Sequence, residues 1–191
     1  MKTTILKIIV FVFTVGLFSN CNQITLTNQE AQALIVRALL LPQKFNEEVN
    51  ANSNDPLGVG KKCQKIEDNG FVWKEGNWIY GYTLHVTDKG KPYLLGQGKD
   101  MHGKNTLQFQ AFDIDFNEVT GIAINKEQQT ASVRFSLKAI NISPISRLLE
   151  ENINNPRNAE LVFKKFDNGW QLAVDQNKPA IDMVKKIWWG K

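Results

Sequence analysis

The sequence has few of the residues that most directly reveal chemistry. Its 191 residues include only two cysteines and two histidines. Two cysteines cannot build the disulfide framework of a small secreted domain. Lys2 and Lys7 lie in a starting segment that, as argued below, we expect to be cleaved off. Without them the chain has 21 basic and 19 acidic residues and is close to neutral. Binding to nucleic acid needs a concentrated basic patch. We therefore expect neither a disulfide scaffold nor a nucleic-acid partner.

The apolar run near the start of the chain is too short to span a membrane as a helix. It covers Ile8 to Phe18, which is eleven residues, and a spanning helix needs about 20 apolar residues. A short basic start containing Lys2 and Lys7 precedes the run. A basic start followed by a short apolar run is typical of a signal peptide.

The end of this run resembles a known processing motif. The segment Leu17-Phe18-Ser19-Asn20-Cys21 resembles the lipobox of bacterial lipoproteins, in which the cysteine is diacylated and becomes the new N-terminus. The resemblance implies a signal peptide over 1–20, lipidation of Cys21 and a tether over 21–27. It also implies export to the cell envelope, and Asn22 in place of Asp implies the outer membrane of a Gram-negative cell.

Lipidation would fix where the protein works, because two or more buried acyl chains anchor a protein stably to a bilayer. Plain secretion and an uncleaved anchor are the alternatives. A Cys21–Cys63 disulfide would exclude lipidation of Cys21. We interpret Cys63 as a buried thiol that packs as a small hydrophobe. A catalytic role for Cys63 is disfavoured, because no histidine lies near it in the sequence to act as a base.

The chain beyond the tether begins with a helix. Thr27 and Glu30 have the spacing of a capping box, and Pro42 predicts the end of the helix, so we expect a helix over 28–41. Apolar residues then recur on one face of it, at Ala31, Leu34, Ile35, Ala38 and Leu39. The polar stretch 43–60 predicts a short helical extension followed by a long loop.

From Cys63 onward, alternation of apolar and polar residues predicts strands. We expect a strand over 78–86, a turn at 88–91 and a hairpin partner over 92–96. The apolar positions change face between Ala111 and Phe112, which indicates a bulge or a bend. The clearest alternation lies over 131–139 and predicts a strand with one face in the core and the other toward water. Its core face consists of Ala131, Val133, Phe135, Leu137 and Ala139.

The last third of the chain adds a strand over 119–124, a hairpin and two short helices. Ser143 and Pro144 predict a helix that runs through Asn152. Strands over 160–166 and 170–174 flank the turn Asp167-Asn168-Gly169. The apolar spacing within 179–189 suits a final helix.

Together these elements predict one α+β domain over 28–191, with the N-terminal amphipathic helix packed on a curved antiparallel sheet. The closing segment 161–172 resembles the last hairpin of many NTF2-like domains, and the whole arrangement resembles the NTF2-like or cystatin-like group. A β-sandwich with an added helix is the alternative.

Candidate catalytic or metal-binding residues are sparse. His85, Asp100 and His102 have no recognised metal-ligand spacing, so we predict no metal and no cofactor. Segment 113–118 begins like a calcium loop but lacks glycine at its sixth position and an acidic twelfth residue. Acid–base catalysis by Asp113 and Asp115 would need a raised pKa in an apolar cleft. We therefore assign no catalytic residue.

Aromatic residues give the candidate ligand-binding set. The set consists of Trp73, Trp78, Tyr80, Tyr82 and His85. Aromatic faces stack on sugars and flat apolar ligands and dominate interface energetics. The alternation favours a competing interpretation, in which Trp78, Tyr80 and Tyr82 are the core face of a strand.

The C-terminal segment 185–191 combines lysines with two tryptophans, a composition suited to a membrane interface. We prefer the interpretation in which one tryptophan docks on the sheet and the lysines are in water.

These observations predict a non-catalytic envelope lipoprotein that binds an envelope protein or a small apolar or sugar ligand at the membrane surface. A small envelope enzyme with an NTF2-like pocket is one alternative, and it predicts that His85, Asp113 or Asp115 converge in a deep apolar cleft. A binding module instead predicts an aliphatic interior with exposed aromatics. The other alternative is a factor that blocks another envelope component through 43–60 or the C-terminal segment.

Overall fold

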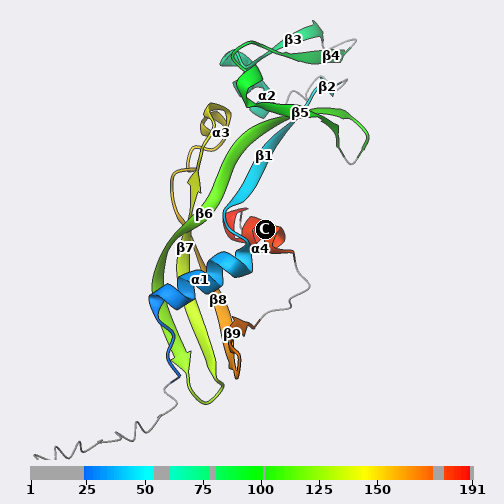
Figure 1. The fold of residues 1–191 in the computed structure, drawn as a ribbon. Coiled ribbons are helices and arrows are strands. Elements are labelled where there is room, and N and C mark those ends of the chain that lie inside the picture. Colours follow the sequence, from blue (N-terminus) through cyan, green and yellow to red (C-terminus); the bar gives the residue numbers. More distant parts are fainter. Residues whose placement is uncertain (1–23, 54–60, 78–80, 101, 174–178, 190–191) are drawn as a thin grey trace, which may run out of the picture.

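A computed structural model provides the structure of the chain. It describes residues 24–53, 61–77, 81–100, 102–173 and 179–189, so the predicted signal peptide and Cys21 lie outside the described residues. Within those ranges the chain is α+β with a curved antiparallel sheet (Figure 1). The elements are α1 (Asn28–Leu39), β1 (Gln43–Asn50), β2 (Asn52–Ser53), α2 (Lys61–Asp68), β3 (Val72–Asn77), β4 (Gly81–Val86), the 3-10 helix η1 (Lys91–Tyr93), β5 (Leu94–Lys99), β6 (Asn105–Asn125), β7 (Thr130–Ile140), α3 (Pro144–Leu149), β8 (Arg157–Phe166), β9 (Gly169–Leu172) and α4 (Ala180–Trp189).

The main sheet is organised around β6, which is 21 residues long. Its strand order is β1-β6-β7-β8-β9, and β5 also pairs with β6. Phe45 of β1 pairs with Phe112 and Asn46 pairs with Gln110, so Ala111 has no partner in β1. This confirms the predicted bulge. Because one residue is skipped, the apolar positions before and after Ala111 stay on the same face of the sheet.

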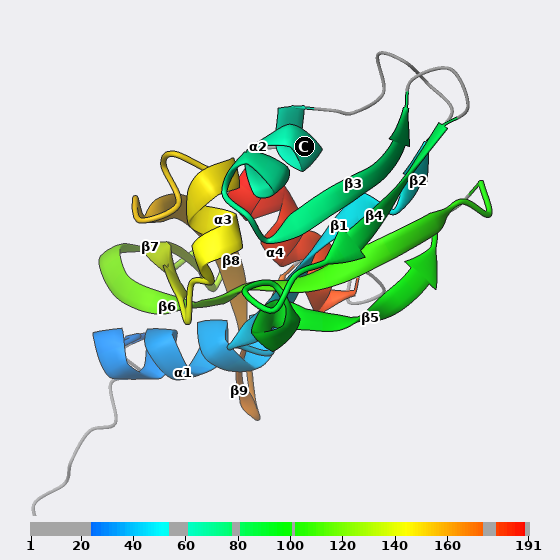
Figure 2. The ribbon, with the colours of Figure 1, turned by 90° about the horizontal axis from the view of Figure 1, so that it is seen from above.

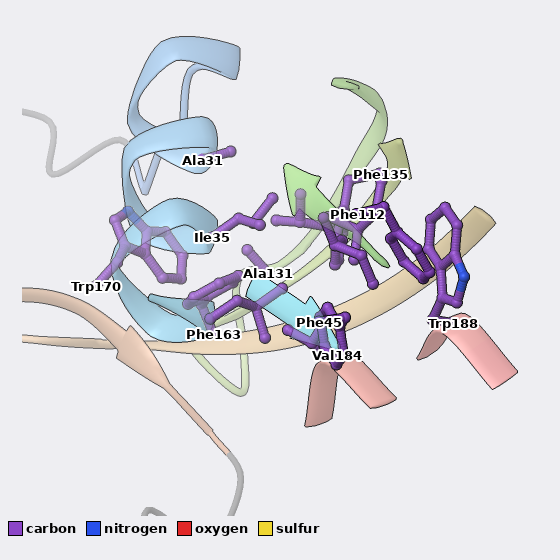
Figure 3. Packing of buried hydrophobic residues seen from close by; sticks show 14 of the residues in the cluster. Ala31, Ile35, Phe45, Phe112, Ala131, Phe135, Phe163, Trp170, Val184 and Trp188 are labelled. Atoms are coloured by element: carbon purple, nitrogen blue, oxygen red, sulfur yellow. The ribbon is translucent and has the colours of Figure 1, made fainter. Parts of the chain in front are cut away.

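The larger hydrophobic cluster lies between the main sheet and the helices α1 and α4. Figure 3 shows Ile35 of α1 and Val184 of α4 together with Phe135 and Phe163 of the sheet. The core face predicted for β7 is confirmed at four positions, where the side chains are fully buried: Ala131, Val133, Phe135 and Leu137.

The prediction that the other face of β7 meets water is wrong at Ser136, which is 1% exposed. Its hydroxyl oxygen accepts a hydrogen bond from Nδ2 of Asn117, 3.0 Å away. The neighbouring strand β6 therefore supplies a partner for the buried hydroxyl, as a buried polar group requires.

The capping box at the start of α1 is present. The backbone N–H of Glu30 donates to Oγ1 of Thr27 (3.2 Å), and the N–H of Thr27 donates to Oε2 of Glu30 (2.9 Å). The helix ends at Leu39, two residues earlier than predicted, because Leu40 adopts a left-handed conformation with φ 51°.

A second hydrophobic cluster lies at the other end of the molecule. There β2, β4 and β3 form a small antiparallel sheet, and Figure 2 shows β3 and β4 side by side with α2 next to β3. The buried residues Ile66 of α2, Leu84 of β4, Phe109 of β6 and Ile145 of α3 belong to this cluster. The long strand β6 thus contributes to both clusters.

Three predictions between residues 43 and 96 are wrong. Residues 43–50 form strand β1, not a helical extension, because pairing with β6 buries Phe45 and Val49. Residues 61–68 form helix α2, where strands were expected to begin. Residues 92–96 do not pair with β4, since β5 pairs with β6. Residues 54–60 and 78–80, parts of the predicted loop and strand, lie outside the described residues.

The predictions for the last third of the chain are confirmed in part. Residues 119–124, predicted as a separate strand, are the end of the long strand β6. Ser143 caps α3, where the backbone N–H of Ser146 donates to its Oγ; the helix ends at Leu149. Strands β8 and β9 form the predicted hairpin. In α4, Trp188 is 3% exposed and Trp189 is 38% exposed. The Trp189 ring also packs edge-on against Phe45 of β1, with centroids 5.2 Å apart, so both tryptophans contact the sheet and not one as expected. No helix among the described residues is long and apolar enough to cross a membrane.

Candidate functional site

The predicted aromatic set is brought together only in part. Trp73 of β3 pairs directly with His85 of β4, and their rings stack with centroids 4.3 Å apart and planes 18° apart. Direct cross-strand partners lie on the same face of a sheet. Trp73 remains 48% exposed, so this face presents a large aromatic surface to solvent.

Glu75 extends this surface with a charge. It lies two residues after Trp73 in β3, on the same face, and its Oε2 lies 2.8 Å from Nε2 of His85. The two groups form an ion pair when the imidazole is protonated. The result is an exposed stack with a carboxylate at its edge, which we call the Trp73 surface (Trp73, Glu75 and His85).

Tyr82 faces the other way. It pairs with Gly76 and belongs to the second hydrophobic cluster at 7% exposure. The core interpretation is therefore correct for Tyr82. Trp78 and Tyr80 lie outside the described residues.

The candidate acid–base residues do not converge. His85 lies on the small sheet, whereas Asp113 and Asp115 lie on β6. Oδ2 of Asp113 accepts a hydrogen bond from Nδ2 of Asn141 (2.8 Å), and Oδ1 of Asp115 accepts one from the N–H of Phe116 (2.8 Å). Each carboxylate thus accepts a hydrogen bond from a group close to it, and neither lines a cleft together with His85.

The second histidine lies in a turn that Asp100 organises. Oδ1 of Asp100 accepts hydrogen bonds from the backbone N–H groups of Lys104 (2.9 Å) and His102 (2.8 Å). The bond from Lys104 is the largest cause of the lowered pKa of Asp100. Among the described residues no three histidine, cysteine, aspartate or glutamate side chains gather closely enough to hold a metal ion.

Cys63 of α2 is a free, buried thiol. Burial, helped by the nearby carboxylate of Glu67, raises its pKa from 9.0 to about 11. Because the thiolate is the nucleophilic form, Cys63 is protonated and unreactive at neutral pH.

Sequence reasoning missed a hollow of about 490 Å³ between the turn after α3, the start of β8 and the end of α4. We call it the α3–α4 hollow. Its lining consists of Glu150, Glu151, Asn152, Arg157, Ile187, Trp188 and Trp189. These residues come from three separate segments, so no local spacing in the sequence indicated the site; the tryptophan pair was the one signal available.

No protein-family model, curated protein or solved structure matches the chain.

Proposed function

We propose that the protein is an envelope lipoprotein, anchored through acylated Cys21, whose domain binds a partner at the membrane surface without catalysing a reaction. The observation that carries the proposal is the Trp73 surface, an exposed aromatic stack. Large aromatic side chains in such positions supply most of the energy of many interfaces. The separation of His85 from Asp113 and Asp115 favours binding over the enzyme alternative.

The position of the Trp73 surface agrees with this role. In Figure 1 the described chain begins at the lower end of the molecule, while β3 and β4 lie at the upper end. Cys21 is three residues from Ile24, so it lies within about 11 Å of it. An acylated Cys21 would therefore hold the lower end at the membrane and direct the Trp73 surface outward.

We also propose a fold group for the domain. We infer an NTF2-like or cystatin-like arrangement, supported by Ala31, Ile35 and Leu39, which bury one face of α1 in the cluster formed with the curved sheet. The occupant we expect at the Trp73 surface is an envelope protein, with a sugar or small apolar ligand as the other class.

Capture from envelope extract of the natural host tests the binding role. Trp73→Ala should weaken capture by about 2 kcal/mol or more, as for a tryptophan at the centre of an interface. Leu95→Ala is the matched control, because Leu95 is 55% exposed on β5 outside the Trp73 surface. Equal capture by both variants and the unmodified protein would remove the Trp73 surface from the proposal.

A further inference from the structure

The α3–α4 hollow contains two buried hydrogen-bond donors without acceptors. Trp188 is only 3% exposed, and its Nε1 has no hydrogen-bond partner. Nε of Arg157 is likewise buried and unpartnered. Figure 3 shows the indole nitrogen of Trp188 on the side of the ring turned away from Phe112 and Phe135, so it does not point into the hydrophobic cluster.

Such an arrangement needs an explanation, because a buried donor without an acceptor destabilises a fold by about 1–3 kcal/mol. Two of them at one place are not accounted for by packing alone. The guanidinium of Arg157 lies over the Trp188 ring, with 5.6 Å between Cζ and the ring centroid. Both donors therefore lie close together in the lining, although protein atoms cover each of them.

The charge of Arg157 is also unneutralised. Arg157 forms no ion pair with any carboxylate of the described residues. One of the two acidic lining residues, Glu150, already has a partner, since its Oε1 accepts a hydrogen bond from Nε1 of Trp189 (3.2 Å). A guanidinium that lacks a carboxylate is a ready partner for one, because its planar fork matches carboxylate geometry.

We propose that the α3–α4 hollow binds a small organic carboxylate. Its oxygens accept hydrogen bonds from Arg157 and from Nε1 of Trp188, and its apolar part lies against Ile187 and Trp189. Both donors are covered by protein atoms, so binding requires the Arg157 side chain to turn from its position over the Trp188 ring. The acidic residues Glu150 and Glu151 at the same hollow limit the affinity for ligands with more than one negative charge.

The proposal is independent of the lipid anchor and of the Trp73 surface. It gives the protein a second site, which binds a small molecule and lies on other elements than the Trp73 surface. Its test therefore does not depend on the outcome of the capture experiment.

Benzoate and benzamide form a matched pair of probes, since they share a ring and a planar group but only benzoate is charged. The full chain in detergent, labelled with ¹⁵N at the indole nitrogens, gives one signal for each of its five tryptophans, and Trp188→Phe identifies the signal of Trp188. We expect benzoate to shift the Trp188 signal saturably and benzamide to leave it unchanged.

Trp170 provides an internal control. Lys165 lies over its ring at the same 5.6 Å, but its Nε1 already donates to the carbonyl of Thr25 (3.1 Å). Its signal should not respond to benzoate. A response of Trp170 equal to that of Trp188 would show a non-specific effect of the anion and would overturn the proposal.

Arg157→Gln should weaken benzoate binding about tenfold to a hundredfold, the loss expected for a charged hydrogen bond, and Arg157→Lys should weaken it less. Glu150→Gln should strengthen benzoate binding, because the substitution removes a negative charge from the lining of the hollow. Unaltered signals of Trp73 in β3 and Trp170 in β9, which do not line the hollow, show that each variant is folded. Absence of a saturable shift in the unmodified protein, or equal shifts with benzamide, contradicts a carboxylate site, and neither result needs a variant.

Discussion

Phe135 contributes to the fold through its position in β7, where it is fully buried among side chains of the sheet and the helices. Phe135→Ala removes most of a large apolar side chain and leaves a cavity, so we expect the free energy of unfolding to fall by about 3–5 kcal/mol. Urea denaturation measures this change. Arg134→Ala, at the exposed neighbouring position, is the control and should change it by about 0.5 kcal/mol or less.

Cys63 gives a prediction about pH. Well below pH 9.0 the thiol is protonated in both the folded and the unfolded chain, so its contribution to stability is fully present. Between pH 9.0 and about 11 the unfolded chain loses the proton first, because burial raises the folded pKa. The free energy of unfolding should therefore decrease as the pH rises through this range.

Cys63→Ala isolates this effect, because other groups titrate equally in both proteins. The difference in stability between the unmodified chain and Cys63→Ala should shrink from pH 8 to pH 10, measured by urea denaturation under reducing conditions. A difference that is constant over this range would show that the thiol is not desolvated in the folded protein.

Among the elements, α1 shows how strongly a local signal can define a helix. Its capping box and its buried stripe are both visible in the sequence. Thr27→Ala removes the acceptor for the N–H of Glu30 and should lower the free energy of unfolding by about 1 kcal/mol. Gln32→Ala, at an exposed position inside the helix, should not lower it. An equal loss in both variants would show that the effect is not specific to the cap, since alanine is the most favourable residue inside a helix.

Local periodicity was sufficient for β7 and for the β8–β9 hairpin, where each strand alternates regularly or is joined by a turn of recognisable chemistry. It failed for β1. Phe45 and Val49 are four residues apart, a spacing that fits one face of a helix as well as one face of a strand, and only pairing with the distant β6 decides between them. The same limit hid the α3–α4 hollow, because Arg157 and Trp188 are far apart in sequence.

The structure brings together only part of the predicted aromatic set, for a similar reason. The sequence identified the aromatic residues of β3 and β4, but the pairing of Trp73 with His85 separates the exposed pair from the buried Tyr82. Alternation within β4 assigned Tyr82 to the core, but only the register of the two strands shows that Trp73 lies beside His85 on the opposite face.

At the scale of the whole molecule, β6 connects two hydrophobic clusters and places the two ends of the protein apart (Figure 1). The described chain begins at one end, and the Trp73 surface lies at the other. In the function we propose, this separation lets one end be held at a membrane while the opposite end binds a partner. The proposed function therefore depends on the anchor at Cys21.

The intact mass of the protein isolated from its natural host tests that anchor most directly. We expect the mass of residues 21–191 increased by fatty acyl chains on the first residue, with the signal peptide removed. A chain that retains Met1, or one in which the Cys21 sulfur carries no lipid, would contradict the account.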